Sequence, residues 1–447
     1  MISVRCFDSL EDAATLRDDV NALNRLAARP DPFSTFEFFE TYLRHDEDFP
    51  AGRGVKVWFL AAFRDAQLIG YLALKQVTRR TLGLRAVTVG FLVTHDTDRP
   101  HVVSRSEDLP QVSDAFYAHL LARRREWSCL EFQQQDDSSS LFPPPAGADL
   151  KGCLVRQWTS LENCTIPVRW GNLSDYFHAM SRKFRVNLGR QMRALLAEGA
   201  VELLTSSHPA TTPALFELYL GIEAHSWKAE AKASIGRHPE RIAYFRSLLG
   251  ARQPMRVSIQ ILLLDGEPVA GLICGAFEAR LYALHIVYDD RLARLAPGSA
   301  MLLLGMRQAI VGRCDAFNLL SGFGYFKVRW LAQITPLQVA QIYRVGSLLY
   351  WRRVIGDFRR SVFSAALNEA RVLFNPLRRS VGLTGRAPAE PAKGARPPQA
   401  GAERQRIAAL VAEARAGQGE FLSPVALMAV MPPEVQRAPR SDPAARP

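Results

Sequence analysis

Residues 257–330 decide the fold, and they open with VSIQILLLDGEPVAGLICGAF from Val257 to Phe277. Two apolar runs, residues 256–264 and 269–277, flank the turn residues Asp265-Gly266-Glu267-Pro268. Turn residues between two such runs predict a buried β-hairpin. A third apolar run, from Leu281 to Tyr288, predicts the strand that follows the hairpin.

A helix is predicted next, beginning at Ala296-Pro297-Gly298-Ser299-Ala300 and ending near Val311. The first turn of a helix directs backbone N–H groups and the positive end of the helix dipole outward. We therefore expect an anion-binding site where the third strand leads into this helix. A short strand, Ala316 to Leu320, completes the unit and leads into residues 321–330.

Composition limits the class of protein without selecting a function. The chain has 447 residues, 48% apolar and 22% charged, which is typical of globular proteins with two or three domains. Its net charge of +12 favours an acidic partner, such as nucleic acid, an anionic membrane surface or a polyanionic cofactor. An arginine-rich composition without a binding role is the alternative.

Targeting signals and cysteine spacing predict the compartment. The six cysteines have neither C-x-x-C nor metal-site spacing, so we expect reduced thiols. The N-terminus lacks the apolar core of a signal peptide, and no apolar run is long enough to span a membrane. The sequence therefore predicts a cytoplasmic protein, with peripheral attachment to the inner membrane face left open.

The order of elements in residues 257–330 occurs earlier in the chain. Helices are expected at Ser9–Ala28 and Thr35–Leu43, and a hairpin at residues 55–77 places Asp65 where the later hairpin has Asp265. A strand, a loop, a helix and a strand follow each hairpin. We predict an α/β fold of two related domains in tandem, each with a mixed sheet. Their boundaries are residues 1–165 and 166–345.

Two basic helices are predicted in the second half. One begins at Ser181 and carries Arg182, Lys183 and Arg185, which are either phosphate ligands for an acceptor or a solvated basic face. The other, Ser347 to Phe374 within residues 346–380, either docks on an anionic membrane or covers the sheet. Residues 381–447 are rich in Pro, Ala, Gly and Arg, so we expect a disordered tail, helical only at Glu403–Ala414 and without chemistry.

Together these residues resemble the Gcn5-related N-acetyltransferase (GNAT) superfamily. More narrowly, the chain is similar to the CelD/BcsL-type acetyltransferases, relatives of the Fem peptidyl transferases with two such folds in tandem. The resemblance covers roughly residues 1–345. It rests on the order and spacing of these motifs: Pro32-Phe33, Phe38-Phe39, residues 181–188, Trp227, residues 265–270, Tyr288-Asp289, Pro297-Gly298 and residues 324–330.

The resemblance implies acyl transfer from acetyl-CoA or another acyl-CoA, without a metal, to an amine or hydroxyl. In that superfamily the thioester lies between two central strands and the pyrophosphate lies at the start of the helix that follows. The implied donor-binding residues are Ile286, Val287, Arg294, Gly298, Ser299 and Ala300. The chain departs from the superfamily's R/Q-x-x-G-x-G/A signature, because Gly298 and Ala300 fall one residue late when counted from Arg294.

Several side chains are candidates for the chemistry. His285 is the first candidate for a general base, and a hydrogen-bonded core histidine is the alternative. Asp289 is the second candidate base or a turn cap. Tyr325 could protonate the leaving thiolate and Lys327 could bind an anionic acceptor, or both could simply end a strand. Trp227 is expected to line the acceptor pocket or to pack in the core.

A loop with His95, Asp96, Asp98 and His101 has the residue types of a metal site but no fixed ligand spacing. We expect a solvated loop there and no metal.

Three functions remain open. The first is an acyl-CoA-dependent acyltransferase, for which the CelD/BcsL resemblance implies a lipid-linked or nucleotide-linked glycan acceptor in envelope or exopolysaccharide synthesis. The second is a Fem-like transferase that uses aminoacyl-tRNA, the one case in which nucleic acid is an expected partner. The third is a non-catalytic binding or regulatory protein that keeps the fold.

Overall fold

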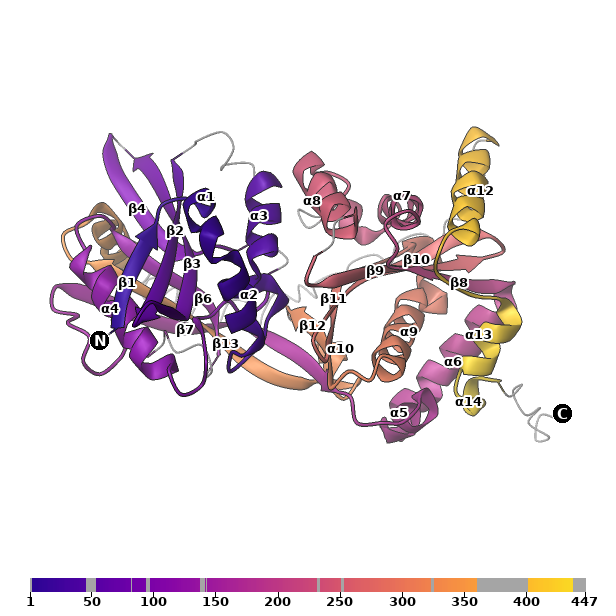
Figure 1. Cartoon of the computed structure of the whole chain (residues 1–447). Helices are drawn as coiled ribbons and strands as arrows, with labels where there is room; N and C mark the ends of the chain where they lie inside the picture. Colours follow the sequence, from indigo (N-terminus) through magenta and orange to yellow (C-terminus); the bar gives the residue numbers. More distant parts are fainter. Residues whose placement is uncertain are drawn as a thin grey trace, which may run out of the picture.

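A computed structural model describes residues 2–45, 54–81, 83–93, 97–136, 141, 143–230, 234–250, 253–322, 325–359 and 401–436. Its strands form one mixed sheet in the order β1-β2-β3-β4-β6-β13-β7-β12-β11-β10-β9-β8-β14, with the short β5 beside β3. Helices cover both faces of this sheet (Figure 1). The predicted mixed α/β class is confirmed.

The first half contains the strands β1 (Ile2–Phe7), β2 (Val55–Arg64), β3 (Gln67–Thr81), β4 (Leu84–Phe91), β5 (Val103–Ser104) and β6 (Cys129–Gln135). Its helices are α1 (Leu10–Ala13), α2 (Arg17–Arg25), α3 (Phe36–His45) and α4 (Leu109–Ala122), with 3₁₀ turns η1 (Ala14–Leu16) and η2 (Pro32–Ser34). The prediction of one helix over Ser9–Ala28 was wrong, because η1 separates α1 from α2. The edge strand β1 was not predicted.

The second half contains β8 (Val201–Ser206), β9 (Arg256–Leu264), β10 (Glu267–Phe277), β11 (Arg280–Tyr288) and β12 (Ala316–Ser321). Its helices are α5 (Leu173–Ala179), α6 (Arg182–Glu198), α7 (Thr212–Glu223), α8 (Pro239–Gly250), α9 (Pro297–Val311) and α10 (Tyr325–Val328), with 3₁₀ turns η3 (Trp227–Glu230) and η4 (Asp290–Leu295). The predicted hairpin, third strand, helix and short strand are confirmed.

The two hairpins have the same turn. Both central residues have positive φ in each, 49° and 70° at Asp65 and Ala66, and 52° and 79° at Asp265 and Gly266. This is the type I′ geometry that matches the twist of a hairpin. Each half also has one parallel contact at the corresponding place, β4 with β6 and β11 with β12. The repeat inferred from the sequence is thus visible in the backbone.

The last strands of the two halves are exchanged. Strand β13 (Gln333–Arg344), at the end of the second half, pairs with β6 of the first. Strand β7 (Cys153–Pro167), at the end of the first half, pairs with β12 of the second and also with β13. The residue 165 boundary therefore lies inside a strand that belongs to both halves.

Helices from the two halves meet on one face of the sheet. Helices α2 and α3 lie on this face of the first half, and α7 and α8 on the same face of the second (Figure 1). The ring of Phe33 lies 5.6 Å from that of Tyr282, and the ring of Phe38 lies 6.3 Å from that of Tyr244. One apolar core therefore joins the halves. Helix α4 covers the opposite face of the first half, and α5, α6 and α9 that of the second.

The C-terminal residues 401–436 are folded. The helix predicted at Glu403–Ala414 is confirmed, and the prediction of disorder was wrong for residues 415–436. Residues 401–436 form α12 (Gly401–Ala416), β14 (Glu420–Leu422), α13 (Pro424–Val430) and α14 (Pro433–Gln436). Strand β14 pairs with β8, and α12 packs on α7. Burial of a few apolar side chains holds this segment, among them Val411, Leu427 and Val435. Residues 381–400 and 437–447 lie outside the described residues.

The predicted helix at Ser347–Phe374 is described only in part. Residues 348–359 are helical, and residues 360–374 lie outside the described residues. Within the part of the chain that the structure describes, no helix has the length and apolar character needed to cross a membrane.

Candidate active site

The two central strands of the second half separate along their length. Strands β11 and β12 pair only where Arg280, Leu281 and Tyr282 face Ala316, Phe317 and Asn318. Beyond the pair Tyr282 and Asn318, β11 continues six residues along β10, while β12 remains paired with β7 as far as Ser321. The two strands thus leave an opening between residues 283–288 and 319–321.

A β-bulge shapes the β11 side of this opening. Ile273 pairs with His285 and Cys274 with Ala283, so Leu284 is the extra residue. Bulges re-aim side chains and often lie beside active sites. The bulge places His285 on the face that carries α7 and α8, where its ring lies 5.9 Å from that of Tyr219.

The hydrogen-bond pattern determines which backbone groups face the opening. The N–H of Asp289 donates to the carbonyl of Val269 on β10, at 2.9 Å. Because the pattern alternates along an antiparallel strand, Val287 also faces β10, while Ile286 and Tyr288 face the opening. Of the two predicted donor-binding residues on β11, Ile286 is therefore placed to contact a ligand there. Val287 has a buried side chain and directs its backbone to β10.

A buried histidine lies between a phenol and an ammonium beside this opening. His285 Nδ1 lies 2.5 Å from the Tyr219 hydroxyl, and His285 Nε2 lies 3.3 Å from Lys228 Nζ. Lys228 also donates to the carbonyl of Ile286, at 2.8 Å. One ammonium therefore connects the imidazole to the backbone edge at the opening. These contacts are those of a hydrogen-bonded core histidine, which was the alternative to a general base.

Lys228 and Tyr219 were not among the candidates from the sequence. Lys228 directly follows Trp227, which was selected, but only the folded loop brings it to a strand 57 residues later. The loop is held by a buried carboxylate, because Glu223 accepts from the backbone N–H groups of Ile235 and Gly236 at 3.0 and 2.7 Å. No spacing in the sequence indicates these contacts.

Asp289 caps a turn. Its carboxylate accepts from the backbone N–H of Arg291 at 3.0 Å and from the Arg291 guanidinium at 2.6 Å. The next residue, Asp290, donates its N–H to the carbonyl of His225 at 3.2 Å, and burial raises the pKa of its carboxyl. These contacts tie the end of β11 to the loop that carries Trp227. The side chain of Trp227 is 57% exposed, so it is not a core residue.

The predicted anion site lies at the start of α9, next to Tyr288. A Cβ atom on Gly298 would come within 2.8 Å of Tyr288 Cδ1, so the helix start packs tightly on the end of β11. The N–H groups of Ser299 and Ala300 donate to the carbonyl of Ala296, at 2.9 and 3.3 Å. The positive end of the helix dipole still lies at this helix start, where it would attract an anion.

Arg294 lies apart from this helix start. Its guanidinium is largely exposed and lies 2.6 Å from the Glu198 carboxylate at the far end of α6.

Lys327 holds the end of β12. Its ammonium donates to the carbonyls of Leu319, Leu320 and Gly322, at 3.0, 3.4 and 3.3 Å. Burial lowers the pKa of this ammonium. The backbone of Tyr325 begins α10 rather than ending a strand, and its side chain lies outside the described residues. Lys327 thus stabilises the backbone at the end of β12, beside the opening.

The basic first turn of α6 lies beside the residues that follow α10. Phe184 packs on Trp330 with ring centres 5.4 Å apart. Arg182 and Lys183 are exposed, while Arg185 donates to the carbonyl of His178 at 2.7 Å. Helix α6 has 17 residues, and Arg294 pairs with Glu198 at the end opposite this basic turn. The structure therefore separates Arg294 from the other predicted basic ligands.

The loop around Asp98 is buried, so the expectation of a solvated loop was wrong for Asp98 and His101. The Asp98 carboxylate accepts from Asn163 at 2.9 Å, from Asn318 at 3.0 Å and from Ser321 at 2.6 Å. One carboxylate from the first half thus fixes β7 and β12 at the opening. His95 and Asp96 lie outside the described residues, and no metal-type cluster occurs within those described.

The folded tail contributes to a pocket of about 300 Å³ at the end of β11. Asp289, Arg291 and His225 line one side, and Glu403 and Arg406 of α12 line the other. Glu217 at this pocket pairs with Arg406 at 3.0 Å. The tail, to which the sequence assigned no chemistry, therefore meets the loop beside the candidate site.

Comparison with known proteins gives a family for part of the chain. Residues 182–328 match the family described as acetyltransferase (GNAT) domain. No curated protein sequence matches the chain.

Solved structures similar to the chain include FemX, at 10% identity, with 76% of this chain and 96% of that chain covered and a TM-score of 0.49. A tandem GNAT protein from the clavulanic acid biosynthesis pathway has 11% identity, coverage of 76% and 98%, and a TM-score of 0.43. The C-terminal domain of a putative lysylphosphatidylglycerol synthetase from Agrobacterium fabrum has 13% identity, coverage of 80% and 97%, and a TM-score of 0.45.

The matched residues begin at the basic turn of α6 and end with α10, so they include both strands of the opening and the helix start beside it. This segment is a GNAT acetyltransferase domain, and by that domain the chain is an acyltransferase.

Proposed function

We propose that the chain transfers an acyl group from acetyl-CoA or another acyl-CoA to an amine or hydroxyl of a lipid-linked or nucleotide-linked glycan precursor. The opening between β11 and β12 carries this proposal. A backbone edge at Ile286 and Tyr288 leads along it to the start of α9. An extended thioester can pair with such an edge, and its phosphates can lie at a helix N-terminus.

Lys228 is the side chain that we assign to the chemistry. The acceptor forms a bond to the thioester carbon, the carbon–sulfur bond breaks, and the thiolate leaves. The Lys228 ammonium, held at the Ile286 carbonyl, stabilises the developing negative charge and donates a proton to the thiolate. The acceptor's proton then restores the ammonium. His285 and Tyr219 position Lys228 in this account.

Steady-state assays of thiol release with an acyl-CoA and candidate amine and hydroxyl acceptors test this assignment. We expect Lys228→Ala to lower kcat/KM by about 10²- to 10³-fold, the usual effect of losing one charge-stabilising donor. Lys56→Ala, an exposed lysine on β2, is the matched control and should retain full activity. Equal activity in both variants would show that Lys228 has no chemical role.

Tyr219→Phe tests the positioning role of the imidazole. It removes the hydroxyl that contacts His285 Nδ1 and keeps the buried ring. We expect a shifted pH–rate profile with little change in KM, because the ring would set the orientation of Lys228 rather than bind substrate. An unchanged profile would count against coupling through His285.

The second candidate function is a transferase that uses aminoacyl-tRNA as its donor. The exposed Arg182 and Lys183 favour this function. It predicts tRNA binding that weakens steeply with salt and is reduced by Lys183→Glu. Turnover with acyl-CoA and no salt-dependent tRNA binding would exclude it. Absence of turnover with either donor would instead support the non-catalytic alternative.

A further inference from the structure

The helix at residues 348–359 directs apolar side chains to solvent. Trp351, Ile355 and Phe358 are spaced four and three residues apart, so they share one face. Their exposed fractions are 54%, 54% and 69%. Because apolar residues on a helix that packs on a sheet normally face the sheet, this stripe is on the opposite side from the one expected.

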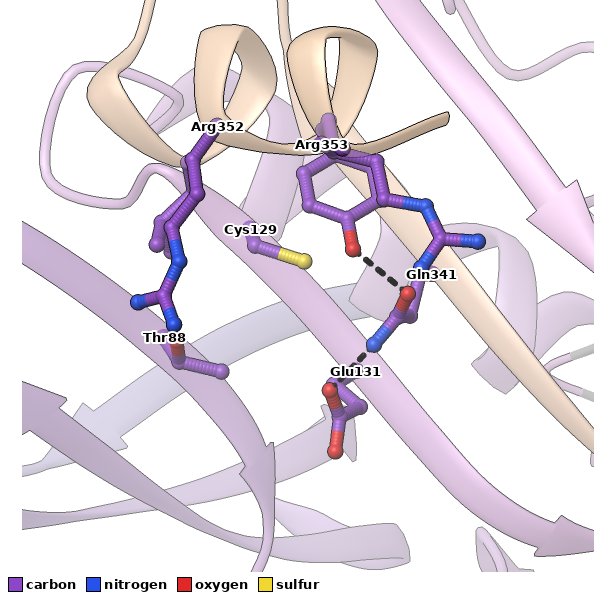
Figure 2. Close-up of a pocket in the computed structure, with 9 residues that line it drawn as sticks. Thr88, Cys129, Glu131, Gln341, Arg352 and Arg353 are labelled. Atoms are coloured by element: carbon purple, nitrogen blue, oxygen red, sulfur yellow. Dashed lines mark hydrogen bonds between the residues drawn. The ribbon is translucent and has the colours of Figure 1, made fainter. Parts of the chain in front are cut away.

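The side of the helix that faces the sheet carries two arginines, with Leu349 as the apolar residue beside them. Between this helix and strands β4, β6 and β13 lies a cavity of about 450 Å³ (Figure 2). Arg352 and Arg353 line it from the helix, and Glu131 and Gln341 from the sheet. The amide of Gln341 donates to Glu131 at 2.5 Å. This arrangement does not support the alternative that the apolar face covers the sheet.

Ion pairs fix which face points outward. Asp357 lies 3.3 Å from Arg353 Nε and also pairs with Arg156 of β7. Rotation of the helix to bury its apolar stripe would break the pair between Asp357 and Arg156, because that pair joins the helix to the sheet. The outward stripe is therefore a property of the folded chain.

Positive charge borders the stripe. Arg359 is exposed and, at about 100° of rotation per residue, lies beside the stripe. Arg352 lies on the same side of the helix, and its side chain extends toward Thr88 at the cavity (Figure 2). The chain as a whole carries a net charge of +12. A stripe with Trp and Phe beside arginines is typical of helices that lie in the plane of a membrane interface.

We propose that residues 348–359 dock the protein on an anionic lipid surface, with Trp351, Ile355 and Phe358 entering the headgroup layer. Anionic lipid is the occupant that matches both the apolar stripe and its arginine border. A second copy of this chain would carry the same positive border and would repel it. This docking is independent of the chemistry proposed for the second half.

Vesicle flotation of the full chain tests the proposal. We expect binding to vesicles of phosphatidylcholine with one third phosphatidylglycerol, at least about tenfold weaker binding to pure phosphatidylcholine, and release as salt is raised. Ile355→Asp with Phe358→Asp should lower binding at least about tenfold. Val425→Asp, at a site 81% exposed on α13, is the matched control and should bind like the parent chain.

Three outcomes would overturn the proposal. The first is equal binding to both kinds of vesicle, and the second is unchanged binding by the double variant. The third is a concentration-dependent dimer, seen by light scattering, that the double variant abolishes while no vesicle binding is found. Acyl transfer to a soluble acceptor should be the same in the double variant and the parent chain, so failure of docking is distinguishable from failure of the proposed function.

Discussion

Asp31 is a buried carboxyl at the start of η2, and burial raises its pKa from 3.8 to about 6. It accepts from the Ser34 hydroxyl at 2.8 Å and from the Phe33 N–H at 3.3 Å. The folded chain therefore holds this proton more tightly than the unfolded chain. Its contribution to stability is complete below pH 3.8 and is lost as pH rises through about 6.

Asp31→Asn should remove this pH dependence. Relative to the parent chain, the variant should gain about 2 kcal/mol of unfolding free energy between pH 4 and pH 7, at about 1.36 kcal/mol per pKa unit. Urea unfolding of both proteins across this range measures the difference. If the difference in unfolding free energy between the variant and the parent chain does not change with pH, Asp31 has the same pKa in the folded and the unfolded chain.

Candidate site residues divide by the kind of contact that defines them. Gly298 could be placed from the sequence, because its role depends on a helix start that local residues encode. Lys228 could not, because its role depends on contacts between α7, its loop and β11. Asp98 was assigned to a solvated loop for the same reason, since its partners lie 65 to 223 residues away.

The C-terminal elements pack on the second half and should stabilise it. Leu427 of α13 is fully buried, while Val425 in the same helix is 81% exposed. Leu427→Ala should therefore lower the free energy of unfolding by about 2–5 kcal/mol, the range for a large buried side chain. Val425→Ala should change it by less than about 0.5 kcal/mol.

Thermal and urea unfolding of these two variants test whether the C-terminal elements stabilise the second half. Equal, small effects would mean that α13 does not pack on the second half. The element was missed because the surrounding residues are rich in Pro, Ala and Arg and resemble a disordered segment. The two hairpins, by contrast, were predicted because their turn residues specify the local backbone.

Exchange of β7 and β13 makes the two halves one folding unit. Strand β7 pairs along its length with β13, and each also pairs with a strand of the other half. We expect a single cooperative unfolding transition for the whole chain. Residues 1–165 and 166–447 expressed apart should expose unpaired strands and aggregate.

Co-expression of the two fragments should restore a soluble complex, because β13 could then insert between β6 and β7. Calorimetry of the full chain and gel filtration of the fragments measure these outcomes. A soluble, folded 1–165 fragment, or two separate transitions, would contradict the exchange. The sequence predicted the repeat from the order of its elements, but the order cannot show which copy each last strand joins.

Calorimetric titration with acetyl-CoA tests the central claim most directly, using the parent chain, Ser299→Asp and Ser299→Ala. A carboxylate at the start of α9 should stabilise the helix by about 0.3–1 kcal/mol while repelling a phosphate there. The account predicts binding that Ser299→Asp weakens at least about tenfold and that Ser299→Ala leaves within about twofold. No binding by the parent chain, or equal binding by all three proteins, would contradict a donor site at β11, β12 and α9.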